Sequence, residues 1–419
     1  MTAYADANDC TYTIKSFFER RAGFMSQITD GHPAPDGFYR TMGEWVAYHL
    51  ARGRSMDGLF QEYYADHESD FALPIGLDQP APWEFREKPF TSHPSPFVGI
   101  IPDGRLWGTK GAVVTPENKL VWDVSVEHSS EPPEQHSVFR QSSLPAPQHY
   151  DETWAVLTYT ASDSYFHWML DVLPRLDLIR KSGLSIDRYV FNYMSIPILP
   201  FQDETLNMLG IPAGKRFQPQ ADSHCQVKQA VIPSLIGYTS HYPKWAVDFL
   251  RKELLPSSIG QTAPSKEASE SFRPGPSGAL NHKRIYVSRA DAFHRRVSNE
   301  QQIVSLLGSH GFVTITPSEY SVSEQIRLFA SADVIISPHG ANLTNIVFCK
   351  PGTLVIELFS PGYVNPIYWA LSNHAQLRYA YLIGSGRRSP ESVHELRGKE
   401  DLTIPPDSLQ KLLSLLGVV

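Results

Sequence analysis

The chain has 419 residues, of which 42% are hydrophobic and 19% are charged, and its formal net charge is −7. This composition is typical of a globular protein with two or three domains. It excludes a protein that binds nucleic acid or an anionic membrane through an overall positive charge.

The cysteines and the N-terminal residues bear on the compartment. Cys10, Cys225 and Cys349 are far apart and odd in number, so they predict neither a disulfide framework nor a zinc motif. Residues 1–30 lack the apolar core of a signal peptide. No run of about 20 apolar residues predicts a transmembrane segment. We therefore expect a cytoplasmic protein, in a reducing compartment, that is at most peripheral to the inner membrane.

Residues 1–75 are expected to form a helical extension. Apolar residues recur at spacings of three and four over residues 12–25, 38–51 and 56–64, which predicts three helices. Such an extension can serve as an arm for homo-oligomerisation.

Residues 76–260 are expected to form the amino-side domain. A proline-rich connector is followed by short apolar runs and turn residues over 99–126, which predict a β-meander. From residue 154 onward strands alternate with helices, including a long helix over 164–181, and this alternation predicts a parallel sheet.

Residues 261–282 read as a linker rich in Ser, Pro and Gly, and a second α/β run over 283–390 follows. Five expected strands with intervening helices make this run a Rossmann-like domain. Residues 391–419 form a tail with an amphipathic helix. The expected fold is therefore α/β, with two Rossmann-like domains facing a cleft at the carboxyl ends of their strands.

The most informative stretch is residues 332–359. A buried strand over 333–337 runs into a Gly-containing loop and a short helix that Asn342 can cap, and a second strand follows at 353–358. The first N–H groups of such a helix can bind a phosphate, with Gly340 and Ala341 leaving room for it. Glu357 could accept hydrogen bonds from a ribose. The alternative is an ordinary turn that binds nothing.

Two further groups of residues can carry chemistry. On a helix, His167 and Asp171 share one face, so the carboxylate can orient the ring and raise its basicity. Arg289, Arg295 and Arg296 follow an expected strand and can clamp a diphosphate. The alternatives are a structural His–Asp pair and a solvated basic loop.

Two motifs are absent from the sequence. No Asp-x-Asp occurs, so the usual carboxylate pair for a metal-bound sugar nucleotide is missing. A departing diphosphate would then need arginines and a helix N-terminus instead of a metal. No strand is followed by Gly-x-Gly-x-x-Gly, which counts against a dinucleotide-dependent epimerase or dehydrogenase.

Taken together, these stretches resemble glycosyltransferase family 61. The resemblance covers about residues 95–385, and its most specific parts are 166–168 with 173–175, Ser288-Arg289, and 340–345. It implies an inverting, metal-independent glycosyltransferase of the GT-B type without a cofactor, which takes a nucleotide sugar as donor and a glycan or lipid-linked glycan as acceptor. Since the expected protein has no signal or anchor, the resemblance is to bacterial members that build capsule, lipopolysaccharide or exopolysaccharide.

The resemblance and the residue patterns together define the candidate site. The catalytic base is expected to be His167 or Asp171. The alternatives are a catalytically inactive sugar-nucleotide-binding or scaffold protein and another nucleotide-sugar enzyme such as an epimerase. The expected donor-binding residues lie in two segments of the second domain: Arg289, Arg295, Arg296, His339, Gly340, Ala341, Asn342, Leu343, Thr344 and Glu357.

Overall fold

The computed structural model describes residues 31–64, 71–78, 80–86, 95–127, 131–237, 242–260, 282–386 and 398–419. The helix expected at 12–25 and nearly all of the linker expected at 261–282 lie outside the described residues. Among the described helices, none is both long and apolar enough to cross a membrane.

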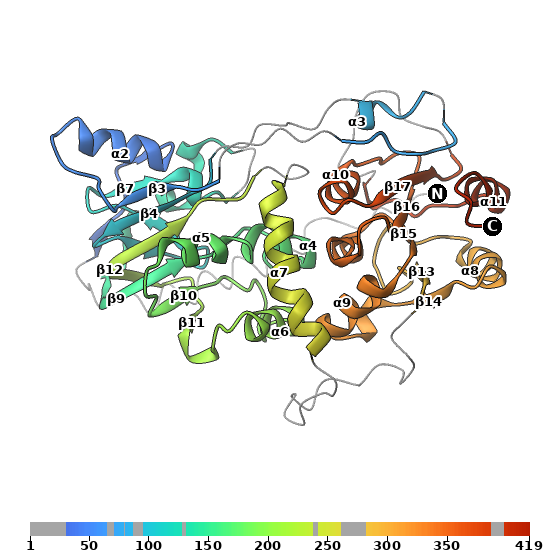
Figure 1. The fold of residues 1–419 in the computed structure, drawn as a ribbon. Helices are drawn as coiled ribbons and strands as arrows, with labels where there is room; N and C mark the ends of the chain where they lie inside the picture. Colours follow the sequence, from blue (N-terminus) through green and yellow to red (C-terminus); the bar gives the residue numbers. More distant parts are fainter. Residues whose placement is uncertain are drawn as a thin grey trace, which may run out of the picture.

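Within the described residues, ten strands form the amino-side sheet (Figure 1). The expected β-meander over 99–126 is present as an antiparallel run at one side of this sheet. Its strands are β4 (Phe97–Pro102), β5 (Arg105–Trp107), β6 (Ala112–Val114) and β7 (Lys119–Val121).

The other side of the amino-side sheet is parallel, as the alternation of strands and helices predicts. Its strands are β9 (Gln148–Val156), β10 (Arg188–Val190), β11 (Arg216–Phe217) and β12 (His224–Pro233). They lie in the order β11-β10-β9-β12, and β12 also pairs antiparallel with β4 and β5. Strand β12 therefore joins the meander to the parallel half. Helices α5 (Arg175–Ser182) and α6 (Pro200–Met208) belong to the connections between these strands.

The N-terminal part differs from the expected helical extension. Helix α2 (Met42–Leu50) lies inside the helix expected at 38–51, but residues 56–64 form a turn and a strand instead of a helix. Strands β2 (Gly37–Tyr39) and β3 (Phe60–Glu62) pair with β7 and β4. The spacing of apolar residues alone was misleading here, because strand pairing with the meander supplies hydrogen-bond partners for the backbone of this segment.

Residues 71–78 and 80–86 lie on the other half of the molecule, where they include α3 (Trp83–Arg86) (Figure 1). The Ile75 N–H donates to the Tyr379 carbonyl (3.1 Å), and the Tyr381 N–H donates to the Ile75 carbonyl (2.9 Å). Phe85 is buried among aromatic rings of that half, Tyr381 among them. The N-terminal segment is thus shared between both halves, and it is not a separate unit over its described residues.

The carboxyl-side sheet is entirely parallel in the order β14-β13-β15-β16-β17. Its strands agree closely with those expected from the sequence: β13 (Arg284–Val287), β14 (Val313–Ile315), β15 (Val334–Pro338), β16 (Leu354–Phe359) and β17 (Arg378–Ile383). The chain runs from β13 to one neighbour, β14, and then returns to the other side of β13 as β15. In open α/β sheets, ligands commonly bind beyond the carboxyl ends of the strands at such a reversal.

Helices cover both faces of the carboxyl-side sheet. On one face, Tyr286 and Ile336 pack in a core with α8 (Glu300–Ser309) and α11 (Pro406–Leu415). On the other face, Ile285 and Ile335 pack in a core with α9 (Val322–Ser331), the 3₁₀ helix η7 (Ala341–Phe348) and α10 (Ile367–His374). This alternation follows from the two-residue period of a strand.

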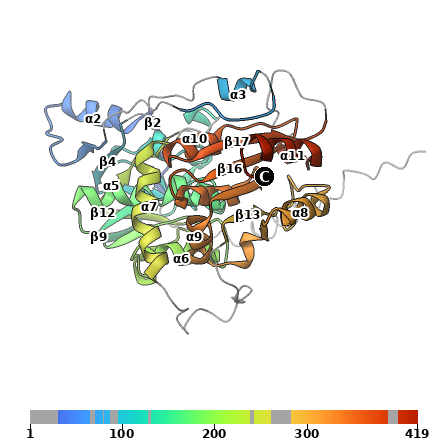
Figure 2. The same cartoon turned by 45° about the vertical axis from the view of Figure 1, so that its right-hand side comes forward.

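The two halves share one continuous core, so they are joined by more than a linker. Helix α7 (Lys244–Gly260) lies between the two sheets in both views (Figures 1 and 2). From α7, Arg251 donates to the carbonyls of Val347 and Cys349. In addition, the Glu204 carboxylate accepts from the first two N–H groups of α9 (both 2.8 Å), where a negative charge is favourable.

The helix expected over 164–181 is interrupted. It consists of α4 (Tyr165–His167), a π-helical segment η4 (Trp168–Val172) and α5. The Leu173 N–H donates to the Trp168 carbonyl (3.1 Å), which is the wider spacing of a π turn. The chain therefore accommodates Pro174, which has no N–H, by widening the turn before it. Single π turns occur frequently at functional sites.

Arg175 fastens this helix to the amino-side sheet. Its buried guanidinium donates to the carbonyls of Val156, Thr158 and Pro233, each at 2.9 Å, at the carboxyl ends of β9 and β12. We expect Arg175→Ala to lower the free energy of unfolding by about 3–5 kcal/mol, because three buried carbonyls lose a charged donor. Chemical denaturation measures this change.

The matched control is Arg40→Ala. The Arg40 side chain is 58% exposed and pairs with Glu134 at 3.5 Å, and exposed pairs of this kind contribute at most about 1 kcal/mol. A loss at Arg175 no larger than the loss at Arg40 would show that the carbonyls find other partners.

Candidate active site

His167 and Asp171 form the pair that their spacing predicts. Nδ1 of His167 lies 2.7 Å from Oδ2 of Asp171, and the same oxygen accepts a 2.8 Å hydrogen bond from the hydroxyl of Tyr242. The Asp171 side chain is 2% exposed, whereas the His167 side chain is 23% exposed. The carboxylate is therefore held inside, and the ring is the part of the pair that a substrate can reach.

Tyr242 is a member of this cluster that the sequence analysis missed. It follows β12 in the chain, and it reaches Asp171 only because the sheet brings the end of β12 beside η4. Burial raises the pKa of the Tyr242 hydroxyl well above its ordinary value, and the neighbouring Asp171 carboxylate adds to this effect. The hydroxyl is therefore a hydrogen-bond donor to Asp171.

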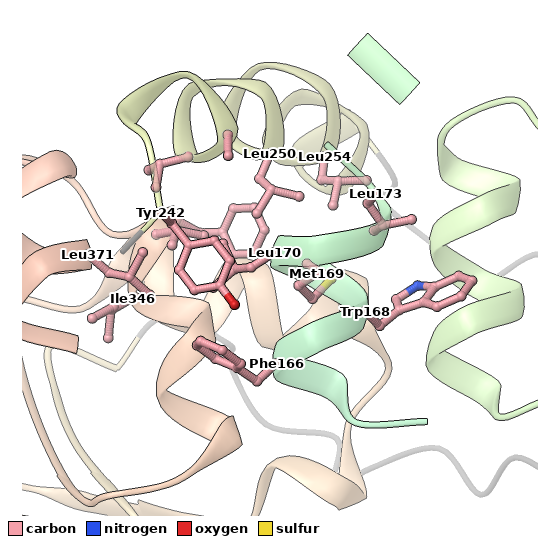
Figure 3. Close-up of a cluster of buried hydrophobic side chains, with 14 of the residues drawn as sticks. Phe166, Trp168, Met169, Leu170, Leu173, Tyr242, Leu250, Leu254, Ile346 and Leu371 are labelled. Atoms are coloured by element: carbon pink, nitrogen blue, oxygen red, sulfur yellow. The ribbon is translucent and has the colours of Figure 1, made fainter. Parts of the chain in front are cut away.

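The pair stands at the boundary between the two halves. Figure 3 shows Phe166, Leu170 and Tyr242 from the amino-side half beside Ile346 of η7 and Leu371 of α10. The apolar residues around η4 thus hold the pair against the carboxyl-side half.

Arg289 follows β13 directly and is only 8% exposed. Its Nη2 donates to the carbonyl of His294 at 3.3 Å, and its Nε has no partner within the described residues. A Cβ atom at Gly340 would lie 1.9 Å from Nη1 of Arg289. Gly340 is thus required for the close approach of the guanidinium, and the room that the sequence analysis assigned to a phosphate is occupied by Arg289.

Arg295 lies near Arg289. It has a left-handed backbone (φ 55°), donates from Nη1 to the carbonyl of Gly398 at 2.8 Å, and lies 5.6 Å from the ring centre of Tyr363. Burial lowers the pKa of Arg289, and the charge of Arg295 lowers it further. Over the part of the chain that the structure describes, neither arginine forms an ion pair with a carboxylate. The two cations therefore form a site that favours an anion.

Arg296, which was also expected to bind the diphosphate, is placed differently from Arg289 and Arg295. Its guanidinium is 51% exposed and forms two hydrogen bonds to Asp401, at 2.9 and 3.1 Å. Its backbone N–H also donates to Asp401 at 2.9 Å. Arg296 thus fastens the C-terminal segment to the loop. The sequence could not show that Arg296 differs from Arg295, because Asp401, the partner of Arg296, is 105 residues away.

His339 and Glu357 form a second His–carboxylate pair. Nδ1 of His339 is hydrogen-bonded to one oxygen of Glu357, and the hydroxyl of Tyr379 donates to the other oxygen. Glu357 was expected to contact a ribose. Its side chain is 0% exposed and both oxygens are occupied, so its position is that of a residue that orients His339.

The Gly340 loop leads into η7 as expected, although its capping is different. The N-cap is Gly340 and not Asn342, and the Leu343 N–H donates to the Gly340 carbonyl at 2.9 Å. The side chains of Leu343 and Thr344 are buried, whereas Ala341 and Asn342 are partly exposed. The first N–H groups of η7, at Ala341 and Asn342, are therefore the ones that can meet an anion.

Tyr368 of α10 connects the two clusters and was also missed from the sequence. Its ring centre lies 5.3 Å from that of His339 and 5.8 Å from that of Phe166, the neighbour of His167. Burial raises the pKa of Tyr368 well above its ordinary value. Since the rings of His167 and Phe166 are also in contact, a series of ring contacts through Phe166 and Tyr368 links His167 to His339.

The segment that holds most of these residues is similar to known proteins. Residues 165–356, which hold both clusters except Glu357, Tyr368 and Tyr379, match the family model described as Glycosyltransferase 61. Beta-1,2-xylosyltransferase RCN11 of Oryza sativa subsp. japonica is 36% identical over 78 residues, 18% of this chain and 15% of the relative. Protein O-linked-mannose beta-1,4-N-acetylglucosaminyltransferase 2 of Homo sapiens is 30% identical over 79 residues, 18% of this chain and 13% of the relative.

The matched proteins are all glycosyltransferases by name. Within that class, the matched segment is similar to glycosyltransferase family 61. The alignment with the rice protein spans about 15% of the length of that relative. Both relatives are eukaryotic, so they lend no support to the expected bacterial capsule-type subgroup.

Proposed function

We propose that the protein is an inverting glycosyltransferase that moves a sugar from a nucleotide sugar to a glycan or glycolipid acceptor without a metal ion. One observation carries this proposal. Among the described residues, Arg289 and Arg295 are partly or fully buried cations without a carboxylate partner, and Arg289 lies at the carboxyl end of β13, where the strand order reverses. Two such guanidiniums at a reversal of this kind fit a diphosphate.

The diphosphate site agrees with the chemistry of an inverting transfer. In a single displacement at the anomeric carbon, negative charge develops on the departing nucleoside diphosphate. Fixed donors stabilise this charge without a metal when they are already in place. Arg289, Arg295 and the free N–H groups at the start of η7 are donors of this kind.

The base should come from the amino-side half. An acceptor hydroxyl must lose a proton as it attacks, and His167 presents an accessible ring whose Nδ1 is held by Asp171. We therefore assign the base to His167 and the orienting role to the buried Asp171. The amino-side half would hold the acceptor and the carboxyl-side half the donor, as in a GT-B enzyme.

The names of the relatives guide the choice of donor and acceptor to be tested. They specify transfer of xylose or N-acetylglucosamine in β-linkages, and one names O-linked mannose as acceptor. Nucleotide derivatives of these two sugars enter the donor panel first. Surface polysaccharides of the capsule, lipopolysaccharide and exopolysaccharide types, and a cytoplasmic site of synthesis, remain the alternatives proposed from the sequence.

The test is a panel of nucleotide sugars offered to the purified protein in excess EDTA. A donor at 100 times its dissociation constant stabilises the folded state by about 2.7 kcal/mol, so we expect one donor to raise the melting temperature by several degrees. We also expect that donor to be hydrolysed slowly without acceptor. Activity that EDTA abolishes and manganese restores would contradict the metal-free part of the proposal.

The same panel separates the alternatives. Stabilisation without hydrolysis, also in the presence of acceptors, would indicate an inactive sugar-nucleotide-binding protein. A protein that no nucleotide sugar stabilises would overturn the proposed function.

A further inference from the structure

The two His–carboxylate pairs are built in the same way. In each pair, Nδ1 of the histidine is bonded to a carboxylate that also accepts from a buried tyrosine hydroxyl. One set consists of His167, Asp171 and Tyr242 and contains the proposed base. The other set consists of His339, which follows β15, with Glu357 of β16 and Tyr379 of β17. The proposed transfer uses only one base, so the second set needs a different role.

The surroundings of His339 indicate this role. A carboxylate only accepts hydrogen bonds, so the neutral His339 ring must carry its proton on Nδ1, facing Glu357. Nε2 then carries a lone pair and can only accept a hydrogen bond. Within the described residues, no group donates one to it. The charges of Arg295 and Arg289 both act on this ring. A phosphate oxygen that reached Nε2 would therefore meet a hydrogen-bond acceptor where it needs a donor.

Resting on the function proposed above, we propose that His339 takes up a proton from solvent at Nε2 when a nucleoside diphosphate binds. The imidazolium then donates a hydrogen bond to a phosphate oxygen and supplies a third positive charge beside Arg289 and Arg295. An N–H bond forms at Nε2, the bond that held the proton in a hydronium ion or a buffer acid breaks, and no bond between two heavy atoms changes. It would give the departing diphosphate the charge that a metal ion supplies in other glycosyltransferases.

The direction of the proton movement follows from the charges around the ring. Burial lowers the pKa of His339, Arg295 and Arg289 lower it further, and the Glu357 carboxylate opposes them. The free protein therefore holds the ring neutral above pH 7. A bound diphosphate neutralises the two arginines and adds a negative charge, so the pKa rises and a proton binds.

The tyrosines around the ring leave this direction unchanged. Tyr363 and Tyr368 pack against the ring, while Tyr379 lies behind Glu357. Burial raises the pKa of Tyr368 and Tyr379 well above the ordinary value, so both stay neutral across the pH range of the experiment.

Isothermal titration calorimetry with UDP and GDP tests this inference. Titrations in EDTA at pH 7.5, in buffers with different ionisation enthalpies, count the protons taken up per bound nucleotide. We expect about 0.5–1 proton for the wild-type protein and a value near zero for His339→Gln, which also binds about 10-fold more weakly. His167→Gln, which alters the other histidine, should keep the wild-type proton count.

A second variant provides an independent test in case His339→Gln does not fold. Glu357→Gln keeps the size of the side chain but removes the charge that stabilises the imidazolium, so it should also abolish proton uptake. Binding of either nucleotide without uptake in the wild-type protein, or with undiminished uptake in both variants, would overturn the inference alone. Failure of the wild-type protein to bind any nucleoside diphosphate would overturn the proposed function together with it.

Discussion

Replacing Arg289 with alanine is expected to abolish measurable nucleoside diphosphate binding while the protein stays folded. A buried charged hydrogen-bond donor that loses its anionic partner typically costs about 2–5 kcal/mol, or roughly 30- to several-thousand-fold in affinity. The fold should survive because the guanidinium makes one hydrogen bond to the protein, to the His294 carbonyl. Calorimetry with UDP and GDP measures the affinity, and circular dichroism verifies folding.

The chain supplies its own control for this experiment. Arg296 lies in the same loop and carries the same charge, but it is paired with Asp401 on the surface. Arg296→Ala should therefore change the affinity by less than about 3-fold. Equal losses in Arg289→Ala and Arg296→Ala would mean that the loop contributes only its overall charge, and the assignment of Arg289 would be wrong.

Gly340→Ala tests the same site from the loop after β15, the strand next to β13. Its added methyl group would lie 1.9 Å from Nη1 of Arg289, so the guanidinium must move. The backbone of Gly340 is extended (φ 165°), and alanine can adopt it without strain. A loss of nucleotide affinity in this variant would thus report the displacement of Arg289 and not a change in the loop.

His167→Ala is expected to lower the rate of sugar transfer by about 10²–10⁴-fold and to leave nucleotide affinity unchanged. The ring is the accessible member of its pair, whereas the proposed nucleotide contacts lie on the other half. Asp171→Asn should be the milder change, because asparagine can still accept from Nδ1 of His167 and from Tyr242. Single-turnover rates with an acceptor identified from the panel measure both effects.

The opposite ranking would reassign the base. If Asp171→Asn loses more activity than His167→Ala, the carboxylate takes the proton and the ring assists it. If both variants transfer sugar at the wild-type rate, the pair is structural, and it then only holds η4 against Tyr242. Melting temperatures of both variants must be compared, since Asp171 is buried and its replacement can act through stability.

Local sequence patterns were sufficient to predict the α/β elements and the contact between His167 and Asp171. The strands from β13 to β17 could be predicted because short apolar, β-branched runs are bounded by Gly, Pro and polar turns. His167 and Asp171 are four residues apart, so even the π turn at η4 left them in contact. The same reasoning failed at residues 56–64, where pairing of β3 with β4 decided the structure.

The sequence by itself determined which residue types stand at the ends of which strands, because this depends on neighbours a few positions away. Their partners became visible only in the folded protein, because each partner lies far along the chain. The Arg289 guanidinium lies against Gly340, and Arg296 is paired with Asp401. Glu357 is hydrogen-bonded to His339 and Tyr379. A charged side chain is available to a ligand only when the folded protein leaves it unpaired, and no local pattern records that.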